Sequence, residues 1–177
     1  MAAGAVRLED HIWDIPDFPK PGIVFKDITP VFLHPEALRS AVGALAEYGR
    51  SREADYIVSA EARGFVLGGA VAAEMGVGFI LARKPGKLPR ETSSVEYELE
   101  YGVDALEVHA DAVAGGARVL VHDDLLATGG TAGALCGLVE QAGGVVAGCA
   151  FVIELAFLRG RERLTGYDVH SLVVYDS

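Results

Sequence analysis

The chain has 177 residues, of which 51% are hydrophobic and 22 are glycine, and this composition fits a single compact α/β domain spanning residues 1–177. Its formal net charge of −10 at pH 7 argues against general binding to nucleic acids or anionic membranes, which requires broad basic surfaces. The chain has no long apolar run and no basic leader followed by an apolar stretch, so we expect a cytoplasmic protein. Cys136 and Cys149 lie in apolar segments and predict buried free thiols.

The predicted elements alternate between helices and strands along most of the chain. Apolar residues at helical spacing, with their flanking residues, predict helices over 8–15, 35–48, 65–75 and 131–142. Short apolar or alternating runs predict strands over 56–59, 79–82, 95–99, 105–109, 119–121, 145–153 and 172–175. Gly76 and Gly143 follow two of the helices, at positions suited to a left-handed cap. This order predicts an α/β fold with a mostly parallel twisted sheet flanked by helices and right-handed crossovers.

Two segments depart from this alternation. Residues 17–27 contain Pro19 and Pro21 and cannot continue a helix, so we expect a flap, within a hood of about residues 1–34, that packs over a flat ligand. The strands at 95–99 and 105–109 have no helix between them. They predict a projecting hairpin that turns near Gly102.

The most informative segment reads VLVHDDLLATGGTAGA, over residues 119–134. Asp123 and Asp124 follow a short buried strand, and ligands of parallel sheets collect at such strand ends. Two carboxylates there suit the neighbouring hydroxyls of a ribose. The next turn leads into the predicted helix and consists of Ala127, Thr128, Gly129, Gly130 and Thr131. Because backbone amides at the start of a helix are free to bind anions, we predict that this turn binds a phosphate.

Two better-known glycine-rich motifs do not fit this segment. The phosphate loop of nucleotide triphosphatases requires a lysine after its last glycine, where this chain has Thr131. The dinucleotide-binding motif has separated glycines and an acid some twenty residues later, whereas here the acids precede adjacent glycines. An ordinary strand-to-helix turn remains an alternative, but it does not explain why acids, threonines and glycines occur together.

The sequence DDLLATGGT after an apolar strand resembles the phosphoribosyl pyrophosphate (PRPP) signature of the type I phosphoribosyltransferases. His122 is a departure, because these enzymes usually have an apolar residue there, and we expect a solvated or hydrogen-bonded histidine that is not a catalyst. Further motifs in the same order resemble the adenine-specific branch of the family: PDFPKPGIVFKDITP, EARGF, ARKPGKLPRET and YELEYG. The resemblance covers nearly the whole chain and implies the type I phosphoribosyltransferase fold with an N-terminal hood.

The resemblance also implies site residues. The pyrophosphate-binding residues would be Glu61, Ala62, Arg63, Arg83, Lys84, Lys87 and Tyr101, with a cis peptide bond expected at Glu61–Ala62. Arg90 belongs to the same basic cluster, which is unusual in so acidic a chain and suits a ligand with several negative charges.

The resemblance implies that the hood and the hairpin carry the residues that act on the base. Val24, Phe25 and Lys26 would lie on the adenine side, with the Val24 backbone reading the base edge and Phe25 stacking. Lys26 would bind phosphate less well than the arginine common there, because lysine has no bidentate fork. Glu100, carried by the closing hairpin, would handle the purine proton or orient the base.

The reaction implied is the transfer of the phosphoribosyl group from PRPP to adenine, giving AMP and pyrophosphate in purine salvage. Mg²⁺ would be held mainly by PRPP and water, with no direct protein ligand. A homodimer is implied, with no nucleic-acid or membrane partner. Two alternatives stay open: a phosphoribosyltransferase for a 6-oxopurine, against which the flap and YELEYG argue, and a non-catalytic PRPP-sensing regulator.

Overall fold

The computed structural model describes residues 6–98 and 102–177. Its centre is a sheet of five strands in which all neighbouring pairs are parallel, in the order β4-β3-β7-β8-β9. These strands are β3 (Tyr56–Ala60), β4 (Gly78–Ala82), β7 (Arg118–Leu126), β8 (Val145–Leu155) and β9 (Val169–Tyr175). The predicted parallel sheet is therefore confirmed.

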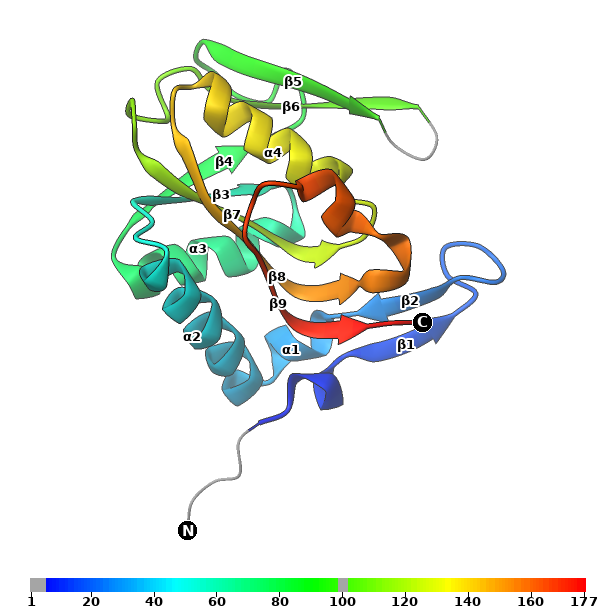
Figure 1. Ribbon diagram of the computed structural model, residues 1–177. Coiled ribbons are helices and arrows are strands. Elements are labelled where there is room, and N and C mark those ends of the chain that lie inside the picture. The colour runs from blue at the N-terminus through cyan, green and yellow to red at the C-terminus, as the bar shows by residue number, and fades with distance from the viewer. Residues whose placement is uncertain (1–5, 99–101) are drawn as a thin grey trace.

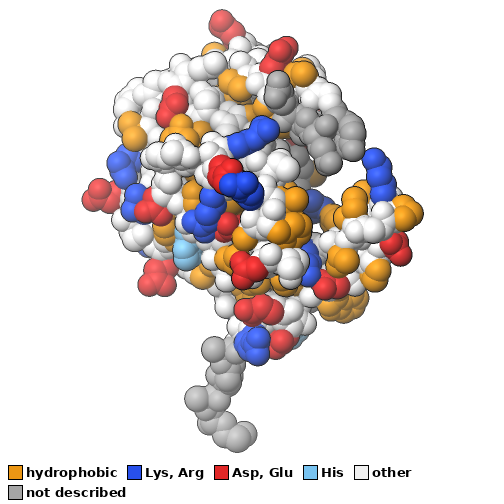
Figure 2. Space-filling view, turned by 45° about the vertical axis from the view of Figure 1, so that its right-hand side comes forward, with side chains coloured by type: hydrophobic (Ala, Val, Ile, Leu, Met, Phe, Trp, Pro, Cys, Tyr) orange, Lys and Arg blue, Asp and Glu red, His pale blue; other side chains and the backbone are white. Residues whose placement is uncertain are grey.

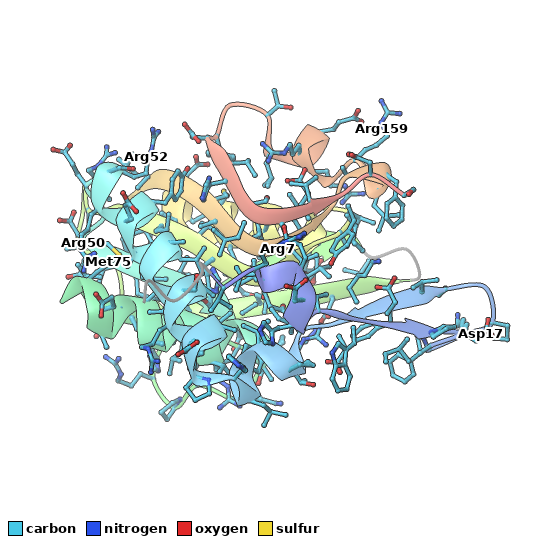
Figure 3. All side chains as sticks on the ribbon, turned by 90° about the horizontal axis from the view of Figure 1, so that it is seen from below. Arg7, Asp17, Arg50, Arg52, Met75 and Arg159 are labelled. Carbon is cyan, nitrogen blue, oxygen red and sulfur yellow. The ribbon has the colours of Figure 1, made fainter. Side chains whose placement is uncertain are left out.

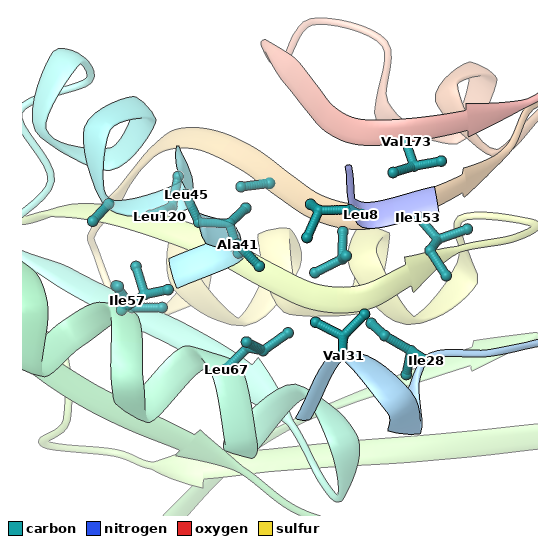
Figure 4. Close-up of a cluster of buried hydrophobic side chains, with 14 of the residues drawn as sticks. Leu8, Ile28, Val31, Ala41, Leu45, Ile57, Leu67, Leu120, Ile153 and Val173 are labelled. Carbon is teal, nitrogen blue, oxygen red and sulfur yellow. The ribbon is translucent and has the colours of Figure 1, made fainter. Parts of the chain in front are cut away.

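Helices cover both faces of the sheet (Figure 1). One face carries the 3-10 turn η1 (Leu8–His11) and the helices α1 (Thr29–Leu33), α2 (Pro35–Ser51) and α3 (Arg63–Met75). The other face carries α4 (Gly130–Gln141). Because side chains alternate along a strand, Leu120 of β7 packs toward the first face and Val121 toward the second. Figure 4 shows the first core, in which Leu45 and Leu67 lie around Leu120 and Ile57.

Two antiparallel ribbons project from this body (Figure 1). The first, which we call the hood ribbon, pairs β1 (Trp13–Pro16) with β2 (Val24–Asp27). The second pairs β5 (Thr92–Glu98) with β6 (Val103–His109) and packs against α4, so the predicted hairpin is confirmed.

The helix predicted over 8–15 is wrong. Only Leu8–His11 is helical, as a single 3-10 turn, and β1 follows it almost directly. The apolar residues in this segment fit a helical period, but Trp13 pairs with Asp27 of β2, and such distant pairing overrides a short local pattern.

Other differences are smaller. Helix α1 and the 3-10 turns η2 (Ala156–Leu158) and η3 (Gly160–Leu164) were not predicted, because each is too short to show a period. Gly76 and Gly143 do have left-handed φ values, of 73° and 79°. No helix in the described ranges combines the length and apolar character that a membrane crossing requires.

The chain order creates a crevice between β3 and β7. From β3 the chain crosses through α3 on one face to β4, whereas from β7 it crosses through α4 on the other face to β8. The pairing of β3 with β7 ends at Ser59 and His122, although β7 continues to Leu126. In parallel sheets such a switch point, at the carboxyl ends of the strands, is where ligands bind.

Candidate active site

The acid pair and the glycine-rich turn line one cavity of about 200 Å³ at the end of β7. Its lining residues are Arg63 together with the continuous run from Asp123 to Ala132. Gly129 is the N-cap of α4 with φ of 82°, a conformation that glycine adopts without a steric penalty. The first turn of α4 follows, and amides in such a turn have no partner within the helix. The cavity therefore combines carboxylates with a phosphate-binding helix start.

The two acids have different surroundings. Asp124 is 6% exposed, and its Oδ2 lies 2.7 Å from Nε of Arg63. Asp123 Oδ1 accepts a hydrogen bond of 2.9 Å from the Asp124 backbone amide. Burial, and then the neighbouring Asp124 charge, raise the pKa of Asp123 well above its usual value. Asp123 thus holds its proton more readily, and a protonated carboxyl can donate to a ribose hydroxyl as well as accept from one.

His122 lies directly before these acids and is buried. Its Nδ1 lies 2.9 Å from the carbonyl oxygen of Ala150 on β8, and because a carbonyl oxygen only accepts, Nδ1 is the donor. Burial lowers the pKa of His122 to about 4. Of the two expected environments, the hydrogen-bonded one is confirmed and the solvated one is wrong.

A second cavity of about 480 Å³ adjoins the first and shares Arg63, Asp123, Asp124 and Thr131 with it. Its other lining residues come from β3, from the turn after it, from residues 83–90, which we call the basic loop, and from the β5–β6 hairpin. They are Ala60, Glu61, Ala62, Lys84, Tyr97, Asp104 and Leu106. The Glu61–Ala62 peptide bond is cis, as the resemblance implied.

Glu61 faces cations and acts as the anchor of the basic loop. Its Oε1 accepts a hydrogen bond of 2.6 Å from the Lys84 backbone amide, and its Oε2 accepts one of 3.0 Å from Nη2 of Arg83. Nζ of Lys87 lies 3.6 Å from the same Oε2. The Lys84 amide bond, followed by Arg83, lowers the pKa of Glu61 below its usual value, so the carboxylate stays ionised.

The hairpin contributes two residues that sequence reasoning did not place in the site. Asp104 forms an ion pair with Lys84 and accepts a hydrogen bond of 3.3 Å from the Tyr97 hydroxyl. Tyr97 and Asp104 are partners in the β5–β6 register, and this register is the signal that would have paired them. Glu100 and Tyr101, both predicted site residues, lie outside the described residues.

On the other side of Arg63 lies the hood ribbon. The guanidinium carbon of Arg63 is 5.6 Å from the centre of the Phe25 ring, and Phe18 meets that ring edge-on at 5.2 Å. Val24 is 50% exposed. Figure 2 shows the molecule hollowed between its body and a smaller lobe rich in apolar side chains, with Lys and Arg side chains along the hollow. Arg63 therefore contacts both the acid pair and the predicted base side.

Lys26 lies apart from both cavities described above. Its Nζ is 2.7 Å from Oδ1 of Asp14 and 4.0 Å from the centre of the Tyr175 ring. The pair with Asp14 joins the two strands of the hood ribbon, and the contact with Tyr175 ties the ribbon to the last strand, β9. Figure 3 shows the hood ribbon extending away from the body, with Asp17 near its tip.

The chain is similar in sequence and in structure to known proteins. The family model described as a phosphoribosyl transferase domain matches residues 31–173. The adenine phosphoribosyltransferase of Rubrobacter xylanophilus is 62% identical over 169 residues, covering 95% of this chain and 91% of that protein. The crystal structure of adenine phosphoribosyltransferase from Thermoanaerobacter pseudethanolicus is similar with a TM-score of 0.92 and 53% identity, covering 95% of this chain and 98% of that one.

A more distant structural relative has ligands in its crystal. The adenine phosphoribosyltransferase of Saccharomyces cerevisiae, complexed with an imino-altritol bisphosphate and adenine, has a TM-score of 0.88 and 38% identity, covering 93% of this chain and 96% of that one.

Proposed function

The chain belongs to the phosphoribosyl transferase family, and from that membership we propose that it transfers the 5-phosphoribosyl group from PRPP to adenine. The products are AMP and pyrophosphate, and the role is purine salvage. The observation that carries the proposal is the position of Arg63, which contacts Asp124 on the ribose side and Phe25 on the base side. The sugar site and the base site thus meet at one side chain.

The two adjoining cavities, the basic loop beside them and the hood ribbon each suit one part of the substrates. Asp123 and Asp124 bind the ribose hydroxyls, and the turn from Ala127 to Thr131 binds the 5′-phosphate through its amides. The pyrophosphate is bound by the cations Arg83, Lys84 and Lys87, by Arg63, by the Ala62 turn and by Tyr101, with Glu61 holding the cationic loop in place. Val24 and Phe25 bind adenine.

The chemistry follows from the charge distribution. As pyrophosphate leaves, positive charge builds at the anomeric carbon of the ribose, where the carboxylates stabilise it. The basic loop meanwhile neutralises the leaving group. Family members generally use PRPP with Mg²⁺, and the carboxylates of Asp123 and Asp124 can accept hydrogen bonds from the waters that magnesium keeps. When bound, the ion would be held mainly by PRPP and water and would neutralise part of the pyrophosphate charge.

We further propose a single domain with its hood at residues 1–34, a cytoplasmic location and a homodimer, with no nucleic-acid or membrane partner. The formal net charge of −10, together with the local cluster of Arg83, Lys84, Lys87 and Arg90, supports a small anionic ligand over a polymeric one.

The direct test is product analysis with PRPP, Mg²⁺ and one of adenine, hypoxanthine or guanine. We expect AMP from adenine and no nucleotide from the 6-oxopurines. IMP or GMP instead of AMP would support the 6-oxopurine alternative. PRPP binding without any nucleotide product would support the regulator.

Glu100 is proposed as the residue that handles the purine proton. Its replacement in Glu100→Gln keeps the size of the side chain but removes its basicity, so kcat should fall about 100-fold with both KM values little changed. Glu96→Gln, on the same hairpin, is the matched control and should keep full turnover. Full turnover in Glu100→Gln with normal binding of both substrates would refute this role.

A further inference from the structure

The segment after β8 supports the phosphate-binding turn from outside the cavity. A Cβ atom added to Gly129 would lie 2.4 Å from the Gly160 carbonyl oxygen, and one added to Gly160 would lie 2.3 Å from the Ala127 carbonyl oxygen. The two backbones are thus in mutual contact, and neither glycine tolerates a side chain without movement of the other segment. Turn η3, which begins at Gly160, therefore sets the position of the turn from Ala127 to Gly129.

An ion pair between the buried Glu154 and the partly exposed Arg161 holds η3 to the sheet. Glu154 is 4% exposed, and its two carboxylate oxygens accept bonds of 2.6 and 2.7 Å from Nε and Nη2 of Arg161. Arg161 also donates a 3.0 Å bond to the Val169 carbonyl oxygen, and the Ser171 hydroxyl donates a 2.6 Å bond to Glu154. The bidentate geometry fixes both the distance and the orientation of the guanidinium.

The sheet places this ion pair close to the site. Glu154 of β8 is the register partner of Leu126, the last residue of β7 before the phosphate-binding turn. The chain thus reaches Gly129 along β7 and reaches Gly160 along β8, with the Glu154–Arg161 pair between the strand and η3. The hydrogen bonds from Arg161 lower the pKa of Glu154 below its usual value, so the pair is charged at neutral pH.

We propose that Glu154 and Arg161 are positioning residues for the 5′-phosphate, acting through the contact between Gly160 and Gly129. The inference rests on the proposed function, because the ligand is the 5′-phosphate of PRPP. Neither residue lines the two cavities that form the site. Their effect is therefore on phosphate binding through the turn and not on chemistry at the anomeric carbon.

The test uses two variants that remove the bidentate contact in different ways. Glu154→Gln removes the negative charge, and Arg161→Lys keeps a positive charge but has no fork to make both bonds. KM for PRPP should rise about tenfold, with kcat and KM for adenine within about twofold of wild type, because a displaced binding group costs affinity. Calorimetry should show the same loss of affinity for ribose 5-phosphate and an unchanged affinity for pyrophosphate. Ser171→Ala removes one hydrogen bond to the Glu154 carboxylate but leaves the ion pair with Arg161 in place, so it gives a milder variant with a smaller shift in the same direction.

Two further variants distinguish a positioning role from a general loss of folding. Gly160→Ala pushes directly on the Ala127 carbonyl and should reproduce the PRPP-specific effect while the ion pair is intact. Arg159→Gln breaks the exposed pair of Arg159 with Glu162, 2.5 Å long, in the same segment and should change nothing. Unchanged ribose 5-phosphate affinity in folded Glu154→Gln and Arg161→Lys, or equal losses for pyrophosphate, would overturn the inference. A wild-type protein that binds neither ligand would instead overturn the proposed function.

Discussion

The ribose-phosphate half of the site and its base half differ in how the chain builds them. The first half comes mainly from one continuous segment, Asp123 to Thr131, at the end of a buried central strand. The base half comes from the hood ribbon, which is held to the body by a few side-chain contacts such as those of Lys26 and Phe25. Under the proposed function, this difference makes PRPP binding a property of the core and base binding a property of a peripheral element.

Of the variants that test the two halves, the one that removes the acid pair should lose the most activity. In the double variant Asp123→Asn with Asp124→Asn, kcat/KM for PRPP should fall about 10²- to 10³-fold, because the carboxylates that stabilise the anomeric charge are gone. Steady-state kinetics measure this, with the exposed Asp10→Asn as a control. A fall of less than threefold would mean that the acids do not contact the ribose.

The buried His122, beside the acid pair, should make the free energy of unfolding depend on pH. The pKa of His122 is about 4 in the folded protein and near 6.5 in the unfolded chain, so between these values only the unfolded chain binds the proton. Stability that is fully present above pH 6.5 is therefore lost as the pH falls toward 4, by up to about 3 kcal/mol.

Denaturant unfolding of wild type and His122→Val at several pH values measures this contribution. The carboxyl groups titrate in both proteins, so the difference between the two curves isolates the histidine. A difference that stays constant from pH 7 to pH 4.5 would contradict the buried neutral ring.

Phe25→Ala tests the base half. Stacking of a base on an aromatic ring is worth about 1 to 3 kcal/mol, so KM for adenine should rise about tenfold or more. KM for PRPP should stay within about twofold, since the acid pair and the phosphate-binding turn are untouched. Phe157→Ala serves as the control, because Phe157 is a phenylalanine outside the hood ribbon, on η2, and is exposed. Equal rises in both KM values would show that the two halves are not separable.

Lys26→Met should have the smallest effect. The variant keeps the apolar stem but removes the pair with Asp14 and the contact with Tyr175, so the hood ribbon is held less firmly. We expect a rise of about threefold in KM for adenine and none for PRPP, since partly exposed ion pairs contribute little. A rise confined to PRPP would instead support the phosphate-binding role that the resemblance implies.

The two halves also differ in how far the sequence predicted them. The acid pair and the phosphate-binding turn follow each other along the chain, so local residue types were enough to predict the cavity they line. The hood ribbon depends on Trp13 meeting Asp27, and no local pattern reports such a pairing, so the first helix was wrongly predicted. The pairing of Glu154 with Arg161 was not predicted, because a 3-10 turn and not a regular helix brings the two residues together.

Buried residues flank the hood ribbon on both sides in the chain. Ile12 precedes β1 and Ile28 follows β2, and both pack in the first core, so the base of the ribbon is fixed by packing while its tip extends away from the body. The ribbon can therefore be treated as an exchangeable specificity module on a constant phosphoribosyl-donor platform. A protein engineer seeking a different heterocyclic acceptor would randomise residues 13–27 and leave the segment from Asp123 to Thr131 intact.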